Sequence, residues 1–100
     1  MANWLQAVLR RIGGTQRYGQ DGIKMERMGR DFYKYIEGDH SVLVQVELQG
    51  GNPDYIIYSA SISQWLPPYE NDKVTDADRS RILQKVGRFI EYYGETYAVR

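Results

Sequence analysis

The chain has 100 residues, with 13 lysines and arginines, 13 aspartates and glutamates, one histidine and no cysteine. This length suits a single domain, and 42% apolar residues are enough for a buried core. Zero net charge argues against general nucleic-acid binding, and the lack of cysteine excludes disulfides and thiolate zinc sites. No apolar run reaches the ~18 residues that a membrane span needs. We therefore expect one soluble, cytoplasmic domain over residues 1–100.

The first 14 residues are predicted to form an amphipathic helix. Asn3 is a suitable N-cap, and Gly13 and Gly14 end the apolar pattern. The apolar residues at helical spacing are Trp4, Leu5, Val8, Leu9 and Ile12. The polar segment 15–22 is predicted to be a linker.

Residues 22–66 are predicted to form an antiparallel sheet. The clearest strand covers residues 42–48, where apolar residues at every second position define one face. Residues 23–28 and 32–36 form the two preceding strands, and a fourth begins at residue 54 and continues, bent, to Trp65. Turns rich in glycine separate these runs, so consecutive strands should pair with one another.

Residues 75–94 are predicted to form a long helix. Thr75 and Asp78 have the spacing of a capping box, and Gly94 is the expected C-cap. Its apolar stripe consists of Ile82, Leu83, Val86, Phe89, Ile90 and Tyr93. Residues 95–99 should form a short last strand. The predicted fold is α+β: an N-terminal helix, a mainly antiparallel sheet of four or five strands, a long C-terminal helix on one face, and the final strand.

Nine tyrosines are the most unusual feature of the composition. If Phe32, Ile36 and Ile57 face the core, strand alternation places some tyrosines on the solvent face. Such tyrosines either form a protein interface or are ordinary half-buried sheet residues. Stacking on nucleic-acid bases is a third possibility, but it requires basic neighbours, and this part of the chain is acidic.

The inventory of catalytic residues is small. His40 is the only imidazole, and its neighbours Asp39 and Ser41 point in other directions on a strand or tight turn. No pair of carboxylates has the setting of an acid/base site, and no glycine-rich phosphate loop is present. We expect no catalytic residues, no metal site and no cofactor; a small hydrolase based on His40 is the remote alternative.

Charge is distributed unevenly along the chain. Residues 37–78 contain eight carboxylates and one lysine, whereas both flanking segments are basic. If the loops of this acidic segment meet at one end of the sheet, they present a negative face to a basic partner. The simpler interpretation is that these carboxylates are solvated loop and helix-cap residues.

Six residues in or beside predicted loops are the candidate partner-binding residues: Asp39, Asp54, Tyr55, Tyr69, Glu70 and Asp72. The carboxylates would speed association, and Tyr55 and Tyr69 would serve as aromatic anchors. Structural explanations remain open, since Tyr69 can pack beneath Pro67 and Pro68, and Asp54 can simply start a strand.

The order of segments in the second half of the chain is distinctive. A strand ends in Ile57-Tyr58-Ser59 and is followed by two short segments, Ser61-Ile62-Ser63-Gln64-Trp65 and Pro67-Pro68-Tyr69-Glu70. A capped helix then begins at residue 74, and the chain closes with Gly94-Glu95-Thr96-Tyr97-Ala98-Val99. This order resembles small immunity proteins of bacterial polymorphic-toxin and contact-dependent growth inhibition systems. The likeness spans roughly residues 19–99 and leaves out the N-terminal helix.

The resemblance implies a non-enzymatic protein that binds one cognate toxin domain, often a nuclease, and blocks its active site or its access to substrate. The partner would then be a basic protein, with no membrane and no nucleic acid bound directly. The alternative is a small nucleic-acid-binding or regulatory module, in which Arg81, Lys85 and Arg88 share one exposed face of the C-terminal helix.

Overall fold

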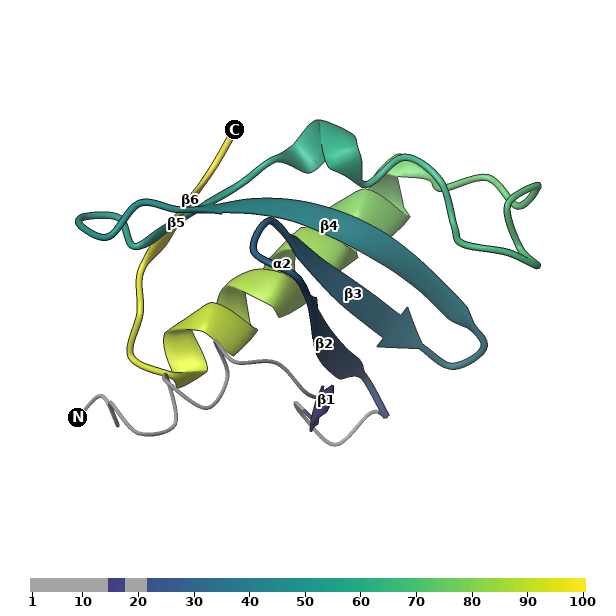
Figure 1. Cartoon of the computed structure of the whole chain (residues 1–100). Helices are drawn as coiled ribbons and strands as arrows, with labels where there is room; N and C mark the ends of the chain where they lie inside the picture. Colours follow the sequence, from purple (N-terminus) through teal and green to yellow (C-terminus); the bar gives the residue numbers. More distant parts are fainter. Residues whose placement is uncertain (1–14, 18–21) are drawn as a thin grey trace.

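The computed structural model describes residues 15–17 and 22–100. Within these residues, six strands form one sheet in sequence order, and one long helix packs against it (Figure 1). The strands are β1 (Thr15–Arg17), β2 (Lys24–Met28), β3 (Phe32–Glu37), β4 (His40–Leu48), β5 (Tyr55–Ile57) and β6 (Tyr97–Val99). A short 3-10 helix, η1 (Ser59–Ser61), follows β5, and the long helix is α2 (Asp76–Tyr92). The helix predicted over residues 1–14 lies outside the described residues.

The sheet is mixed. Neighbouring strands from β1 to β5 are antiparallel, and β6 pairs with β5 in parallel. The α+β class and the mainly antiparallel sheet are confirmed. β6 is parallel because the chain after β5 returns along the sheet through α2, which is the usual connection between parallel neighbours. The linker predicted over residues 15–22 is wrong at its start, where Thr15 of β1 pairs with Glu26 of β2.

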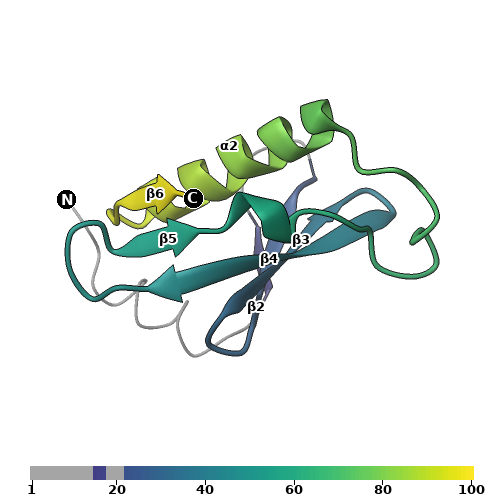
Figure 2. The ribbon, with the colours of Figure 1, turned by 90° about the horizontal axis from the view of Figure 1, so that it is seen from above.

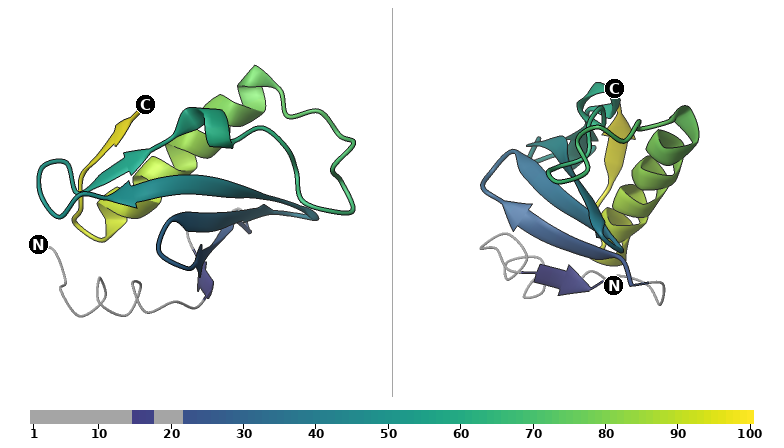
Figure 3. Two further views of the ribbon diagram at one scale, coloured as in Figure 1. Left: turned by 45° about the horizontal axis from the view of Figure 1, so that its top comes forward. Right: turned by 90° about the vertical axis from the view of Figure 1, so that its right-hand side faces the viewer.

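Helix α2 lies along one face of the sheet and gives the protein two layers (Figures 2 and 3). It begins at the predicted capping box: the backbone N–H of Asp78 donates to Thr75 Oγ1, and that of Thr75 donates to Asp78 Oδ2, both at 3.0 Å. The predicted apolar stripe is also confirmed. Ile82, Val86, Phe89, Ile90 and Tyr93 are buried, and Leu83 is partly buried against the same core.

The two tyrosines of β3 face the core, contrary to the expectation that Phe32 and Ile36 do so. Tyr33 is 1% exposed and Tyr35 is 0% exposed, whereas Phe32 is 37% exposed. Burial is tolerated because each hydroxyl finds a partner: Tyr35 donates to Glu37 Oε2 at 2.8 Å, and Tyr33 accepts from Arg27 Nη1 at 3.3 Å. The face of β3 that α2 covers is therefore the tyrosine face.

The predicted continuation of the fourth strand to Trp65 is wrong. β5 ends at Ile57, and the hydroxyl of Ser61 takes over part of the hydrogen bonding to β4 by accepting from the backbone N–H of Gln45 at 2.9 Å. The same hydroxyl donates to the carbonyl of Tyr58 at 2.6 Å. Because a side chain now satisfies the β4 backbone, the chain leaves the sheet as η1 and forms a long loop before α2.

Candidate functional site

Three segments meet at one end of the sheet: the β3–β4 turn, the loop of residues 65–73 and the start of α2 (Figure 1, right-hand side). The loop is held on β4 by a hydrogen bond from the Leu66 N–H to the Ser41 carbonyl, 2.8 Å long. Six of the eight carboxylates of the acidic segment belong to this end: Glu37, Asp39, Glu70, Asp72, Asp76 and Asp78. We call these three segments the acidic end.

His40, the first residue of β4, is the centre of the loop contacts. Its Nε2 lies 2.8 Å from Asp72 Oδ2, and its ring stacks on Tyr69 with a centroid distance of 4.0 Å. The ring also meets Trp65 nearly edge-on, at 5.1 Å. Sequence analysis considered only the adjacent Asp39 and Ser41, whereas the carboxylate that reaches His40 is Asp72, 32 positions along the chain. His40 thus joins β4 to the loop that carries Tyr69 and Glu70.

The His40–Asp72 pair lacks the third member of a hydrolytic site. No hydroxyl among the described residues forms a hydrogen bond with His40, and one side of its ring is occupied by Tyr69. The described part of the chain also has no group of three or more His, Asp or Glu side chains placed to hold a metal ion. The arrangement organises a surface loop.

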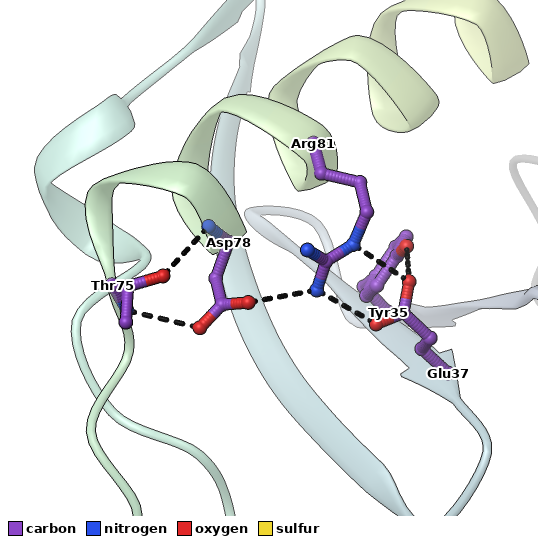
Figure 4. A network of polar contacts seen from close by, with 5 residues as sticks. All are labelled: Tyr35, Glu37, Thr75, Asp78 and Arg81. Carbon is purple, nitrogen blue, oxygen red and sulfur yellow. Dashed lines mark hydrogen bonds and ion pairs between the residues drawn. The ribbon is translucent and has the colours of Figure 1, made fainter.

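Arg81 connects α2 to the β3–β4 turn (Figure 4). Its Nε donates to Glu37 Oε2 at 3.1 Å, and its Nη2 donates to Glu37 Oε1 at 2.8 Å. The same Nη2 also donates to Asp78 Oδ1 at 2.9 Å, and Tyr35 donates to Glu37 from the core side. A guanidinium in two-pronged contact with a carboxylate fixes the orientation of both groups. The turn and the helix start are therefore held in one relative position.

This network shifts the titration of its members. Burial alone would raise the pKa of Glu37, but hydrogen bonds from Arg81 and Tyr35 together with the Arg81 charge lower it below the ordinary value. The hydrogen bond from the Thr75 backbone N–H is the main cause of the lowered pKa of Asp78, and Arg81 adds to it. The hydrogen bond with Glu37 raises the pKa of Arg81. All three groups are therefore charged near neutral pH.

The remaining carboxylates divide into paired and free groups. Asp76 pairs with Arg79 at 2.7 Å. Asp39 and Glu70 are exposed and have no hydrogen bond or ion pair to any described residue, and Asp72 uses only Oδ2. The structure thus brings Asp39, Tyr69, Glu70 and Asp72, four of the six predicted binding residues, together at the acidic end.

The other two predicted binding residues, Asp54 and Tyr55, lie at the opposite end of β4, where β5 begins (Figure 1, left-hand side). Asp54 Oδ2 accepts from the backbone N–H of Thr96 at 2.8 Å and from its hydroxyl at 3.2 Å, so this carboxylate holds the starts of β5 and β6 together. Tyr55 is 0% exposed and belongs to the core. The expectation that a partner can reach Tyr55 is wrong, because all three residues of β5 are buried.

A hollow of about 270 Å³ opens at the acidic end. It is lined by Glu37, His40, Trp65, Asp72, Lys73 and Asp78. Trp65 belongs to the hydrophobic core and is 5% exposed. Sequence analysis did not identify Glu37, His40 and Asp78 as neighbours, because they come from two strands and a helix that no local pattern connects.

The cationic face proposed for α2 is partly used inside the protein. Of the three proposed residues, Arg81 is bound to Glu37 and Asp78. Arg88 is exposed. Arg81 is therefore less available to a nucleic-acid backbone than Arg88, although both were predicted to share one exposed face with Lys85.

Comparison with known proteins places most of this chain in one family. A family model described as Immunity protein 74 matches residues 27–94, from β2 to the end of α2. The curated proteins contain no match to the chain, and neither do the solved structures. Separately, none of the helices in the described ranges has the length and apolar character needed to cross a membrane.

Proposed function

The chain belongs to the Immunity protein 74 family, and from this premise we propose that it binds a cognate bacterial toxin domain in the cytoplasm and blocks its active site or its access to substrate. The match covers the β3–β4 turn, the 65–73 loop and the whole of α2, which are the three segments of the acidic end. The family assignment supports toxin neutralisation, and the geometry of the acidic end supports the binding surface.

The single observation that carries the choice of surface is the free negative charge at the acidic end. Asp39, Glu70 and one oxygen of Asp72 have no cationic partner among the described residues. A toxin domain that acts on nucleic acid needs a basic surface to bind phosphates. An acidic inhibitor matches such a surface and covers it, so a nuclease is the toxin class we favour.

Tyr69 is the expected aromatic anchor of this surface. Its ring is partly buried and rests on His40, which is itself paired with Asp72. A ring held in one place loses little conformational freedom on binding, which favours affinity. Charges that steer the encounter and a rigid aromatic contact that slows dissociation together describe a tight protein inhibitor.

The first experiment measures association with the cognate toxin at low and high salt. The charge reversal Glu70→Lys with Asp72→Lys should slow association at low salt by about tenfold. The difference in association rate between this variant and the original chain should shrink at high salt, because salt screens the charges. A matched control, Asp31→Lys with Glu91→Lys, changes the net charge equally at exposed positions outside the acidic end.

A second variant guards against loss of the loop structure. Asp39→Lys with Glu70→Lys leaves the His40–Asp72 contact intact and should also slow association at low salt. If both variants remain folded and associate at the unchanged rate, the acidic end is not the binding surface.

The mode of action is tested by titration of toxin activity. A binding inhibitor gives a linear loss of toxin activity that ends at equimolar protein, whereas a catalyst that destroys the toxin or its product acts at much lower ratios. We expect the equimolar end point. Complete inactivation at a small fraction of the toxin concentration, lost in His40→Ala, would instead reveal an enzyme.

A further inference from the structure

The hollow at the acidic end has the dimensions of a receptor for one side chain. Its volume of about 270 Å³ is room for one long side chain. Its walls come from β3, β4, the 65–73 loop and α2. Because the Arg81 and His40 contacts hold these elements together, the hollow exists before any partner arrives.

The charge of the hollow favours a cationic occupant. Its lining contains the carboxylates of Glu37, Asp72 and Asp78 and the ammonium of Lys73. Arg81, on the helix side, contacts Glu37 and Asp78 and offsets one of these three negative charges. Asp39 and Glu70 are close to this lining along the chain and add two more negative charges. An anionic side chain would meet repulsion here, and a cationic one is attracted.

Two residues of the lining each have a polar atom that is still able to make new hydrogen bonds. Asp72 Oδ1 has no partner among the described residues, since only Oδ2 contacts His40. The indole N–H of Trp65 likewise has no hydrogen-bond partner in the part of the chain that the structure describes, although this residue is 5% exposed. An indole N–H only donates, so it needs an acceptor such as a peptide carbonyl.

We propose that this hollow receives an arginine or lysine side chain carried on a peptide segment of the toxin. The cation of that side chain binds Asp72 Oδ1, and a carbonyl of the same segment accepts from the Trp65 indole. Guanidinium heads combine strong pairing with carboxylates and good contact with aromatic rings, so arginine is the better occupant. This inference rests on the proposed function and adds to it the chemistry of one contact, that between the hollow and a cationic side chain of the toxin.

The test uses the full chain and a short peptide in place of the toxin. Acetyl-Gly-Arg-Gly-amide is titrated into the nitrogen-15-labelled protein at low salt, with the same peptide containing neutral citrulline as its control. The reporter is the indole N–H resonance of Trp65, one of two tryptophans, assigned by its disappearance in Trp65→Phe. We expect a saturable shift at millimolar arginine peptide and about tenfold weaker binding of the citrulline peptide.

Variants of single carboxylates locate the contact. Asp72→Asn should weaken binding of the arginine peptide about fivefold, because an amide removes the charge at similar size. Asp31→Asn, at an exposed position in the β2–β3 turn, should leave binding unchanged. Equal shifts with both peptides, the absence of a saturable shift at millimolar arginine peptide, or an Asp72→Asn variant that binds as well as the original chain would each overturn the inference.

Failure of this inference is separable from failure of the proposed function. If the peptide does not bind while charge reversal at the acidic end still slows toxin association, the hollow is not the receptor and the binding surface stands. If the peptide binds but the toxin associates normally with both charge-reversed variants, the hollow takes cations and the toxin uses another surface.

Discussion

Arg81 and Glu37 form a two-pronged ion pair between residues 44 positions apart, with contacts of 3.1 Å and 2.8 Å. The pair ties the second turn of α2 to the last residue of β3 (Figure 4). Because Arg81 also binds Asp78 and Glu37 also accepts from Tyr35, one guanidinium links the helix cap to the core of the sheet. The pair therefore sets the geometry from which the acidic end is built.

The first prediction concerns this pair. Arg81→Ala should lower the free energy of unfolding by about 1–2 kcal/mol, since charged hydrogen bonds are lost but both side chains are partly exposed. Urea denaturation measures the change. Arg88→Ala, at an exposed helix position, is the control and should change it by less than about 0.5 kcal/mol. Equal effects of the two variants would show that the Arg81 pair contributes no stability.

The second prediction is a pH dependence. The pKa of Glu37 is lowered in the folded protein from an ordinary value of 4.5, so the unfolded chain binds its proton more readily. The resulting stability is fully present above that ordinary value and is lost as pH falls through the folded pKa. Glu37→Gln should therefore be less stable than the original chain at neutral pH, and the gap should narrow in acid. Denaturant midpoints measured from neutral pH to acid check this, and a constant gap would contradict it.

The third prediction tests the core. Phe89 is 1% exposed, and its ring meets Tyr33 edge-on at 5.7 Å and Tyr93 at 5.3 Å. Phe89→Ala should lower the free energy of unfolding by about 3–5 kcal/mol, because it removes a large buried ring and leaves a cavity. Tyr92→Ala, where the residue is 66% exposed, is the matched control and should cost much less. Thermal unfolding compares the two, and an unchanged melting temperature for Phe89→Ala would contradict the packing.

The fourth prediction concerns Gly87 in the middle of α2. Alanine normally favours a helix over glycine by about 1 kcal/mol. Here, however, an added Cβ would lie 2.4 Å from atoms of the Tyr97 ring. Gly87→Ala should therefore destabilise the protein by about 1–3 kcal/mol, the usual cost of overpacking. In a Tyr97→Ala background, Gly87→Ala should be neutral or stabilising. If Gly87→Ala still destabilises the protein in that background, the Tyr97 ring is not the cause.

Much of the fold could be read from the sequence because its signals are local. The alternation in β4, the capping box of Thr75 and Asp78, and the apolar stripe of α2 each depend on residues within a few positions of one another. Gly94, with a φ of 76°, follows the end of α2 as expected of a residue that stops a helix. The order of these elements was also sufficient for the resemblance to immunity proteins, which the family match supports.

Only the tertiary structure decided which face of β3 is buried. Alternation in β3 defines two faces, but the packing of α2 determined that Tyr33 and Tyr35, and not Phe32, lie inside. The same holds for the candidate site, where Asp54 lies at the far end of β4 while His40 meets Asp72 from 32 positions away. Contacts between distant segments depend on strand register and on the path of the loops, and neither leaves a periodic signal in the chain.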